Sequence, residues 1–143
     1  MNAPTERPEV TEFRNLIEPK LDVIEGRLPI FCIAAEGPNG GMPSGSEIAV
    51  AINTTKDLQE AAEALRSLPD PPDGALAAGN DTEQIGVSVF DAISAALLLA
   101  SQVDSGSISP AVAEPAYIDK VLTPCDDLPD EIETLRETLD VLH

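Results

Sequence analysis

The chain has 143 residues, of which 26 are acidic and 8 are basic, so its formal net charge at pH 7 is −18. This charge repels phosphate backbones and anionic membrane surfaces, which argues against direct binding to nucleic acid or to a membrane. The length predicts a single domain, and a hydrophobic content of 43% indicates a folded chain in spite of the charge.

The N-terminal part of the chain predicts an arm followed by helix. Residues 1–10 contain two prolines and charges of both signs, and we expect them to form a flexible arm ahead of a single domain over residues 11–143. A helical pattern begins after Thr11, is interrupted at Pro19 and reaches Gly26, a residue typical of helix C-caps. This region therefore predicts one kinked helix or two short ones.

The next segment predicts a small antiparallel sheet. Residues 28–35 form a short apolar run rich in Ile and Phe, which is typical of a buried strand. Residues 47–53 predict the second strand, because Ile48, Val50 and Ile52 recur at every second position. Residues 36–46 lie between the two strands and contain four glycines and two prolines, so they predict a long loop.

Helices are expected to follow the sheet. Thr54 or Thr55 is the expected N-cap of a helix that ends before Pro69. Its expected apolar stripe consists of Leu58, Ala61, Ala62, Leu65 and Leu68. Residues 85–103 are the longest apolar stretch, and because they include Asp91 they favour a buried central helix over a membrane span. Residues 104–116 predict a loop and residues 117–122 a short strand or turn.

The last helix has the clearest pattern in the chain. Its apolar positions recur at spacings of three and four residues, and they are Ile132, Leu135, Leu139 and Leu142. Two heptads are too short for an independent coiled coil, so we expect this stripe to pack on the protein's own core. The predicted fold class is α+β, with a small antiparallel sheet packed by three or four helices.

The acidic residues are placed unevenly along the sequence, since no Lys or Arg occurs between Arg66 and Lys120. We take the acidic side chains of this region and of the start of the last helix as a candidate partner-binding surface. The candidates are Asp70, Asp73, Asp81, Glu83, Asp126, Asp127, Asp130 and Glu131. A surface of this kind suits a protein partner with a basic surface.

Residues that could carry chemistry are few. His143 is the only histidine and is terminal, so neither a Ser-His-Asp arrangement nor a zinc site built on His and Cys is expected. Cys32 is interpreted as a small buried hydrophobe and Cys125 as an unreactive loop cysteine. Glu36 is the first carboxylate to examine for acid–base catalysis. The glycine-rich loop lacks the lysine and the spacing of a phosphate-binding loop, and we assign no catalytic, cofactor or metal residues.

A cluster of oxygen-bearing side chains in the middle of the chain has the ligand chemistry of a calcium site. The cluster consists of Asp70, Asp73, Asn80, Asp81 and Glu83. Because its spacing differs from that of an EF-hand loop, calcium binding ranks below the absence of a metal.

These observations favour a non-catalytic module for protein–protein interaction, such as an inhibitor or immunity-type protein that mimics nucleic acid and occupies the basic surface of a nucleic-acid-binding partner. The alternative is a structural subunit, for example of a phage particle, whose acidity reflects a high-salt habitat. A carboxylate-based enzyme ranks third. Only 3% of the residues in the chain are aromatic, so the core is largely aliphatic, which allows a homo-oligomer. The absence of a signal pattern predicts a cytoplasmic location.

Overall fold

The computed structural model of the protein describes residues 7–37 and 42–142, and no strand occurs among these residues. The expected α+β fold with its antiparallel sheet is therefore wrong, and the described chain is helical. The elements in order are α1 (Pro8–Glu36), α2 (Gly45–Thr54), α3 (Lys56–Arg66), α4 (Leu76–Asp104), α5 (Pro110–Tyr117), η2 (Ile118–Leu122), which is a single π-helical turn, and α6 (Thr123–Asp140).

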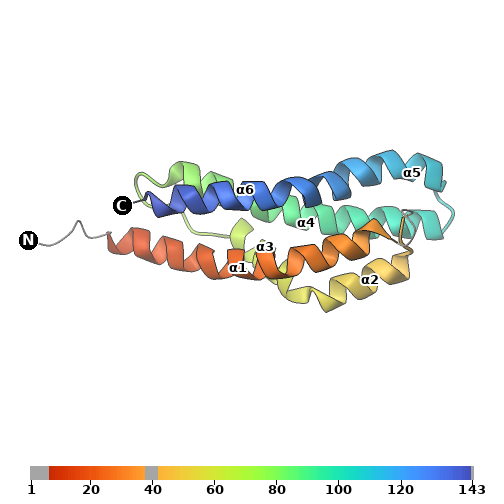
Figure 1. Cartoon of the computed structure of the whole chain (residues 1–143), viewed down its shortest axis with the longest axis horizontal. Coiled ribbons are helices and arrows are strands. Elements are labelled where there is room, and N and C mark those ends of the chain that lie inside the picture. Colours follow the sequence, from red (N-terminus) through yellow and green to blue (C-terminus); the bar gives the residue numbers. More distant parts are fainter. Residues whose placement is uncertain (1–6, 38–41, 143) are drawn as a thin grey trace, which may run out of the picture.

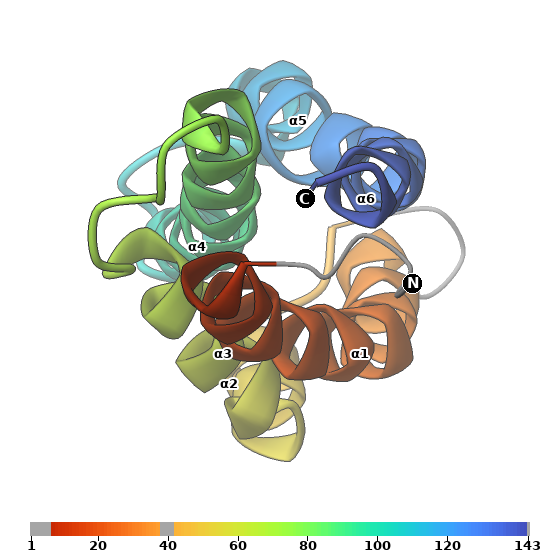
Figure 2. The ribbon, with the colours of Figure 1, turned by 90° about the vertical axis from the view of Figure 1, so that its left-hand side faces the viewer.

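The helices form an elongated bundle of four rods (Figure 1). α1 and α4 are the two unbroken rods, each about 44 Å long at 1.5 Å per residue. The second rod is divided into α2 and α3, and the fourth consists of α5, η2 and α6 in succession. Seen from the end, α1 lies between α3 and α6, and α4 faces α1 across the bundle (Figure 2).

α1 is one helix, although Pro19, Gly26 and Pro29 lie inside it. Its buried residues recur every three or four positions along the whole length, and they are Val10, Phe13, Ile17, Leu21, Ile24, Leu28, Phe31 and Ala35. Burial of this stripe offsets the loss of backbone hydrogen bonds at the two prolines. The first expected strand, residues 28–35, is therefore the last part of α1.

The expected N-terminal arm is also partly helical. α1 begins at Pro8, and proline is favoured in the first turn of a helix because its missing N–H would have no intrahelical partner there. Residues 1–6 lie outside the described part of the chain, as does His143. Of the expected loop over residues 36–46, residues 38–41 lie outside it, while Glu36 ends α1 and Gly45 begins α2.

The second expected strand is helix α2. Ser44 is its N-cap: the Ser44 hydroxyl accepts a hydrogen bond from the Glu47 backbone N–H, and the Glu47 carboxylate accepts one from the Ser44 N–H. The Asp104 carboxylate, at the end of α4, accepts a further bond of 2.6 Å from the Gly45 N–H. The first four backbone N–H groups of a helix have no acceptor within the helix. Because the side chains of Ser44, Glu47 and Asp104 accept hydrogen bonds here, they favour a helix over a strand in this segment.

The second rod bends at Thr55. This residue has φ −110° and ψ 39°, outside the helical region, and its buried hydroxyl donates a hydrogen bond of 2.7 Å to the Ala51 carbonyl. Thr55 precedes α3, as expected, but its side chain makes no capping bond. Four of the five residues of the expected apolar stripe are buried in α3, namely Leu58, Ala61, Ala62 and Leu65, and the fifth, Leu68, is half-buried beyond the end of the helix.

α4 packs closely on α3. A Cβ atom at Gly86 would lie 2.7 Å from the Ala62 carbonyl oxygen and 3.0 Å from the Arg66 backbone nitrogen, so the glycine permits this approach. By length and composition alone, α4 is the one described helix that could cross a membrane, and 44% of its most apolar window is buried inside the bundle. The central helix of a soluble bundle has the same properties.

The fourth rod replaces the expected loop and the expected strand or turn over residues 104–122. α5 is capped by the Ser109 side chain, and the chain continues through η2 into α6 without a break. The buried Tyr117 hydroxyl donates a hydrogen bond to the Ala35 carbonyl near the end of α1. Ile132, Leu135 and Leu139 are buried in the core, as the C-terminal pattern predicted.

A disulfide joins Cys32 of α1 to Cys125 of α6, with the Cα atoms 5.9 Å apart. The interpretation of both residues as unpaired cysteines is therefore wrong. The bond links the first and last long helices across a sequence separation of 93 residues. Cys32 is half-buried beside the apolar stripe of α1. An apolar run in the sequence fits either a buried thiol or a disulfide at this position.

Candidate functional site: an acidic groove between α4 and α6

A groove with a volume of about 280 Å³ runs between α4 and α6. α4 contributes Asp81, Gln84 and Ile85, and α6 contributes Asp130, Glu131 and Thr134. The Ile85 side chain is buried beneath the exposed polar residues. The groove therefore has an apolar floor and three carboxylates along its walls.

The arginines of the protein are bound to carboxylates elsewhere. Arg136 lies on α6, but it pairs across the α1–α6 seam with Asp22 at 2.7 Å and with Glu25. The other arginine pairs are Arg7–Glu9, Arg14–Glu18, Arg14–Asp140, Arg27–Asp57 and Arg66–Glu63. None of these pairs between described residues uses a carboxylate that lines the groove. The groove consequently keeps its negative charge.

Glu131, on the α6 wall of the groove, has a shifted pKa. Burial, and then the carboxylate of Asp127 one turn earlier on α6, raise the pKa of Glu131 above its ordinary value. A carboxyl group with a raised pKa in the folded state favours folding most when it is protonated, so its contribution declines as the pH rises from about 4.5 upward. A cation placed in the groove would relieve this repulsion.

Glu131→Gln is therefore expected to raise the melting temperature at pH 7, by roughly 1–2 °C for a surface charge, and to flatten the decline in stability above pH 4.5. Glu133→Gln is the matched control, because Glu133 is exposed on the same helix but does not line the groove. Thermal unfolding of both variants between pH 4 and 8 measures the difference. Equal changes in the two variants would contradict a special environment at Glu131.

The structure brings together three of the eight candidate partner-binding residues in one groove: Asp81, Asp130 and Glu131. Asp126 and Asp127 are exposed in the first turn and a half of α6 and extend the acidic surface along that helix. Glu83 is exposed on α4 but is not part of the lining.

The remaining two candidates lie elsewhere. Asp70 and Asp73 are in the connection between α3 and α4, where they line a separate pocket together with Arg7. Arg7 also donates a hydrogen bond to the Asp73 carbonyl. The expected acidic surface is thus divided, and its α3–α4 part is close to a positive charge.

The placement of the carboxylates also bears on metal binding and catalysis. Within the described ranges, no group of three or more His, Cys, Asp and Glu side chains is placed to hold a metal ion. Glu36 lies at the end of α1 and shares a pocket of about 260 Å³ with Glu114 and with apolar residues such as Tyr117. No described histidine accompanies these carboxylates, because the one histidine is residue 143.

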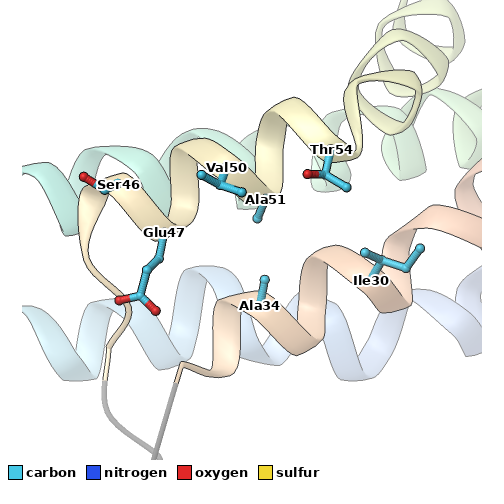
Figure 3. Close-up of a pocket in the computed structure, with 7 residues that line it drawn as sticks. All are labelled: Ile30, Ala34, Ser46, Glu47, Val50, Ala51 and Thr54. Carbon is cyan, nitrogen blue, oxygen red and sulfur yellow. The ribbon is translucent and has the colours of Figure 1, made fainter.

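A second groove was not foreseen from the sequence. It lies between α1 and α2 and has a largely apolar lining (Figure 3). The sequence does contain a signal for helix α2, which forms one wall of this groove. Ser44 and Glu47 have the spacing of a capping box and precede five consecutive apolar residues, 48–52. The recurrence of Ile48, Val50 and Ile52 at every second position is the competing signal, and it predicts a strand.

Comparisons with protein-family models, with curated proteins and with solved structures found no match to the chain.

Proposed function

We propose that this protein is a non-catalytic binding module that presents the α4–α6 groove to a basic surface of another protein, in the manner of inhibitors that mimic nucleic acid. One observation carries the proposal: Asp81, Asp130 and Glu131 converge on one groove, while the arginines pair with carboxylates outside it. A second observation is the raised pKa of Glu131, which results from burial and then from the neighbouring Asp127 carboxylate.

The electrostatic properties of such a module follow from the charge. A net charge of −18 accelerates encounter with a basic partner, and the groove supplies a local point of attachment. The contact weakens with added salt, because the Debye length falls from about 30 Å at 0.01 M to about 3 Å at 1 M ionic strength. The partner class that fits is a nucleic-acid-binding protein with a groove rich in Arg and Lys.

The test uses a fluorescent peptide rich in Lys and Arg as the probe and measures its binding by anisotropy across a salt series. Combining Asp81→Asn, Asp130→Asn and Glu131→Gln is expected to weaken binding about tenfold at low salt, which corresponds to about 1.4 kcal/mol for three surface charges. The affinity of the unmodified protein is expected to fall as salt is added.

The matched control combines Glu12→Gln, Glu60→Gln and Glu114→Gln, which remove the same charge from exposed positions outside the groove. We expect this control to bind the probe within about threefold of the unmodified protein, since exposed pairs contribute little at a distance. Equal losses in the two triple variants would show that total acidity, and not the groove, governs binding. An affinity independent of salt would contradict the proposal altogether.

A second candidate function is that of a structural subunit in an assembly, and the apolar groove between α1 and α2 favours it. Exposed apolar side chains of this groove, such as Ile30 and Val50, would contact another chain of such an assembly. In this alternative the acidity maintains solubility in a high-salt habitat and has no specific partner. The triple variants separate the two functions, because removal of the groove charges would then leave partner binding unaffected.

A further inference from the structure

The Cys32–Cys125 bridge lies in the wall of a pocket between α1 and α6. The pocket has a volume of about 270 Å³, and both cysteines line it and are half-buried. The other lining residues are Glu25, Leu28, Pro29, Pro129 and Ile132. Exposed disulfides are, as a class, more labile than enclosed ones. A thiol can therefore approach this bridge while the bundle remains folded.

Prolines interrupt the backbone hydrogen bonds on both sides of the bridge. In α6, Pro129 has no N–H to donate to the Cys125 carbonyl, four residues earlier. In α1, Pro29 has no N–H to donate to the Glu25 carbonyl, again four residues earlier. Both prolines line the pocket. The backbone next to the bridge is therefore held by fewer hydrogen bonds than an uninterrupted helix.

The fourth rod is also irregular just before the bridge. Pro115 lies inside α5, and Pro124 lies in the first turn of α6. Between them is η2, after which the Thr123 N–H donates to the Ile118 carbonyl, five residues earlier. Single π-helical turns within helices are frequent at functional sites. The position of residues 115–129, the junction of α5 with α6, therefore depends strongly on contacts with other helices.

The contacts that hold this junction are of three kinds. The bridge joins it covalently to α1. The Tyr117 hydroxyl donates a hydrogen bond to the Ala35 carbonyl, one helical turn from Cys32 along α1. Val121 and Leu128 are fully buried in the core. Without the bridge, the apolar contacts keep the junction on the bundle, but one hydrogen bond and side-chain packing must then fix its position.

The rest of the α1–α6 seam is held independently of the bridge. Arg136 pairs with Asp22 at 2.7 Å and with Glu25, and Arg14 pairs with Asp140 at 3.6 Å. These pairs lie farther along the two antiparallel helices, away from α5. Reduction of the bridge is therefore expected to loosen the junction and to leave the remainder of the bundle packed.

We propose that the Cys32–Cys125 bridge is a site of reversible thiol–disulfide exchange with a dithiol reductant, and that its redox state controls how firmly the junction is held against α1. The oxidised form has a fixed junction, and the reduced form has a mobile one. The inference goes beyond the proposed function, since neither cysteine lines the α4–α6 groove.

The exchange proceeds in two steps. One thiolate of the dithiol attacks a sulfur of the bridge, forms a mixed disulfide and releases the other cysteine as a thiolate, which takes up a proton. The second thiolate of the dithiol then attacks the mixed disulfide, closes the reductant's own disulfide and releases the second cysteine. Two electrons pass from the dithiol to the bridge, and the two protons of the dithiol end on Cys32 and Cys125.

The geometry favours a dithiol over a monothiol. After the first step the released cysteine remains beside the mixed disulfide, because the two Cα atoms are only 5.9 Å apart. Its intramolecular attack expels a monothiol and restores the bridge. A dithiol competes with this reversal because its second thiol is also intramolecular. At equal thiol concentration, glutathione is expected to reduce at least about tenfold less of the bridge than dithiothreitol. Equal reduction would overturn the assignment to dithiols.

The rate of reduction tests whether the bridge is accessible in the folded protein. Reduction by dithiothreitol without denaturant is expected to be less than about 100-fold slower than in concentrated urea, as measured by quenching with a maleimide and mass spectrometry. A bridge that reacts only after global unfolding would be slowed on the order of 10³-fold or more. A ratio above about 100-fold would therefore overturn the proposal.

Tyr117 reports on the junction without any substitution. It is the only tyrosine in a chain that has no tryptophan, and it is 2% exposed. Reduction is expected to increase quenching of its fluorescence by acrylamide at least about threefold, while the far-UV circular dichroism keeps about 90% of its helical signal. Oxidised dithiothreitol is expected to restore the original quenching. Unchanged quenching, a loss of the helical signal or a failure to recover would each overturn the proposal.

Pro129→Ala tests the part that the prolines take. It supplies an N–H for the Cys125 carbonyl and is expected to halve, at least, the increase in Tyr117 quenching on reduction. Pro19→Ala is the matched control, because Pro19 is also exposed inside a long helix but does not line the pocket. We expect the control to respond like the unmodified protein. Equal responses of the two variants would overturn the assignment of the mobile segment to this junction.

This proposal and the proposed function fail separately. The rate and quenching measurements involve no peptide, so their outcome does not depend on what the acidic groove binds. Binding of the Lys- and Arg-rich peptide by the oxidised protein reports on the groove alone, since the bridge is then intact and lies outside the groove lining.

Discussion

Reduction of the Cys32–Cys125 disulfide is expected to lower the free energy of unfolding by about 2–5 kcal/mol. The bond closes a loop of 93 residues and joins the first long helix to the last, so it removes much of the conformational freedom of the unfolded chain. Because the bridge also spans the α1–α6 seam, its loss leaves that seam to the apolar core and to the exposed ion pairs of Arg136 with Asp22 and Glu25.

Urea unfolding with and without a reducing agent measures this difference, and the melting temperature should fall by roughly 10 °C. The combined variant Cys32→Ala and Cys125→Ala is expected to match the reduced protein and to be insensitive to the reductant. An unfolding free energy that changes by less than about 0.5 kcal/mol on reduction would show that the bridge contributes little to stability.

The disulfide also bears on where the protein works. We proposed a cytoplasmic location from the sequence, but disulfides persist mainly in oxidising compartments and are reduced in most cytosols. Labelling free thiols with a maleimide in intact cells shows whether Cys32 and Cys125 are oxidised or reduced there. If the pair is oxidised in cells, the cytoplasmic proposal is wrong. If it is reduced, the bundle operates with the lower stability expected above.

The second large effect is expected at Gly86, where replacement by alanine should destabilise the protein by about 1–3 kcal/mol. Alanine is normally preferred to glycine inside a helix by about 1 kcal/mol. At Gly86, however, the added Cβ would lie 2.7 Å from the Ala62 carbonyl oxygen, and the Arg66 backbone nitrogen is only 3.0 Å away. Backbone atoms cannot rotate aside, so α3 and α4 must separate.

Gly26→Ala is the matched comparison. Gly26 is also inside a long helix, but no atom lies within 4 Å of the position of its added Cβ. We expect this variant to stabilise the protein by about 0.5–1 kcal/mol, opposite in sign to Gly86→Ala. Chemical denaturation of the two variants in parallel provides the measurement. Stabilisation by both substitutions would show that α3 and α4 are less closely packed than described.

Several helices were determined by the sequence alone. The apolar stripes of α3 and α6 are local patterns. They predicted all four buried residues of α3 and three of the four buried residues of α6, and they missed Leu128. The stripe of α1 is equally regular, but Pro19 and Gly26 were given more weight than the periodicity. The capping box of Ser44 and Glu47 likewise pointed to a helix where alternation suggested a strand. In both segments a helical pattern competes with another local pattern, and the structure follows the helical one.

Tertiary structure alone decided which residues meet. Asp81 is far from Asp130 and Glu131 along the chain, and the three carboxylates form a groove only because α4 and α6 are neighbours in the bundle. Cys32 and Cys125 form a bridge for the corresponding reason at the α1–α6 seam. The periodicity of apolar residues in a short stretch of sequence identifies the face that a helix buries. The identity of its neighbours depends on how all the buried faces pack together, which no local pattern contains.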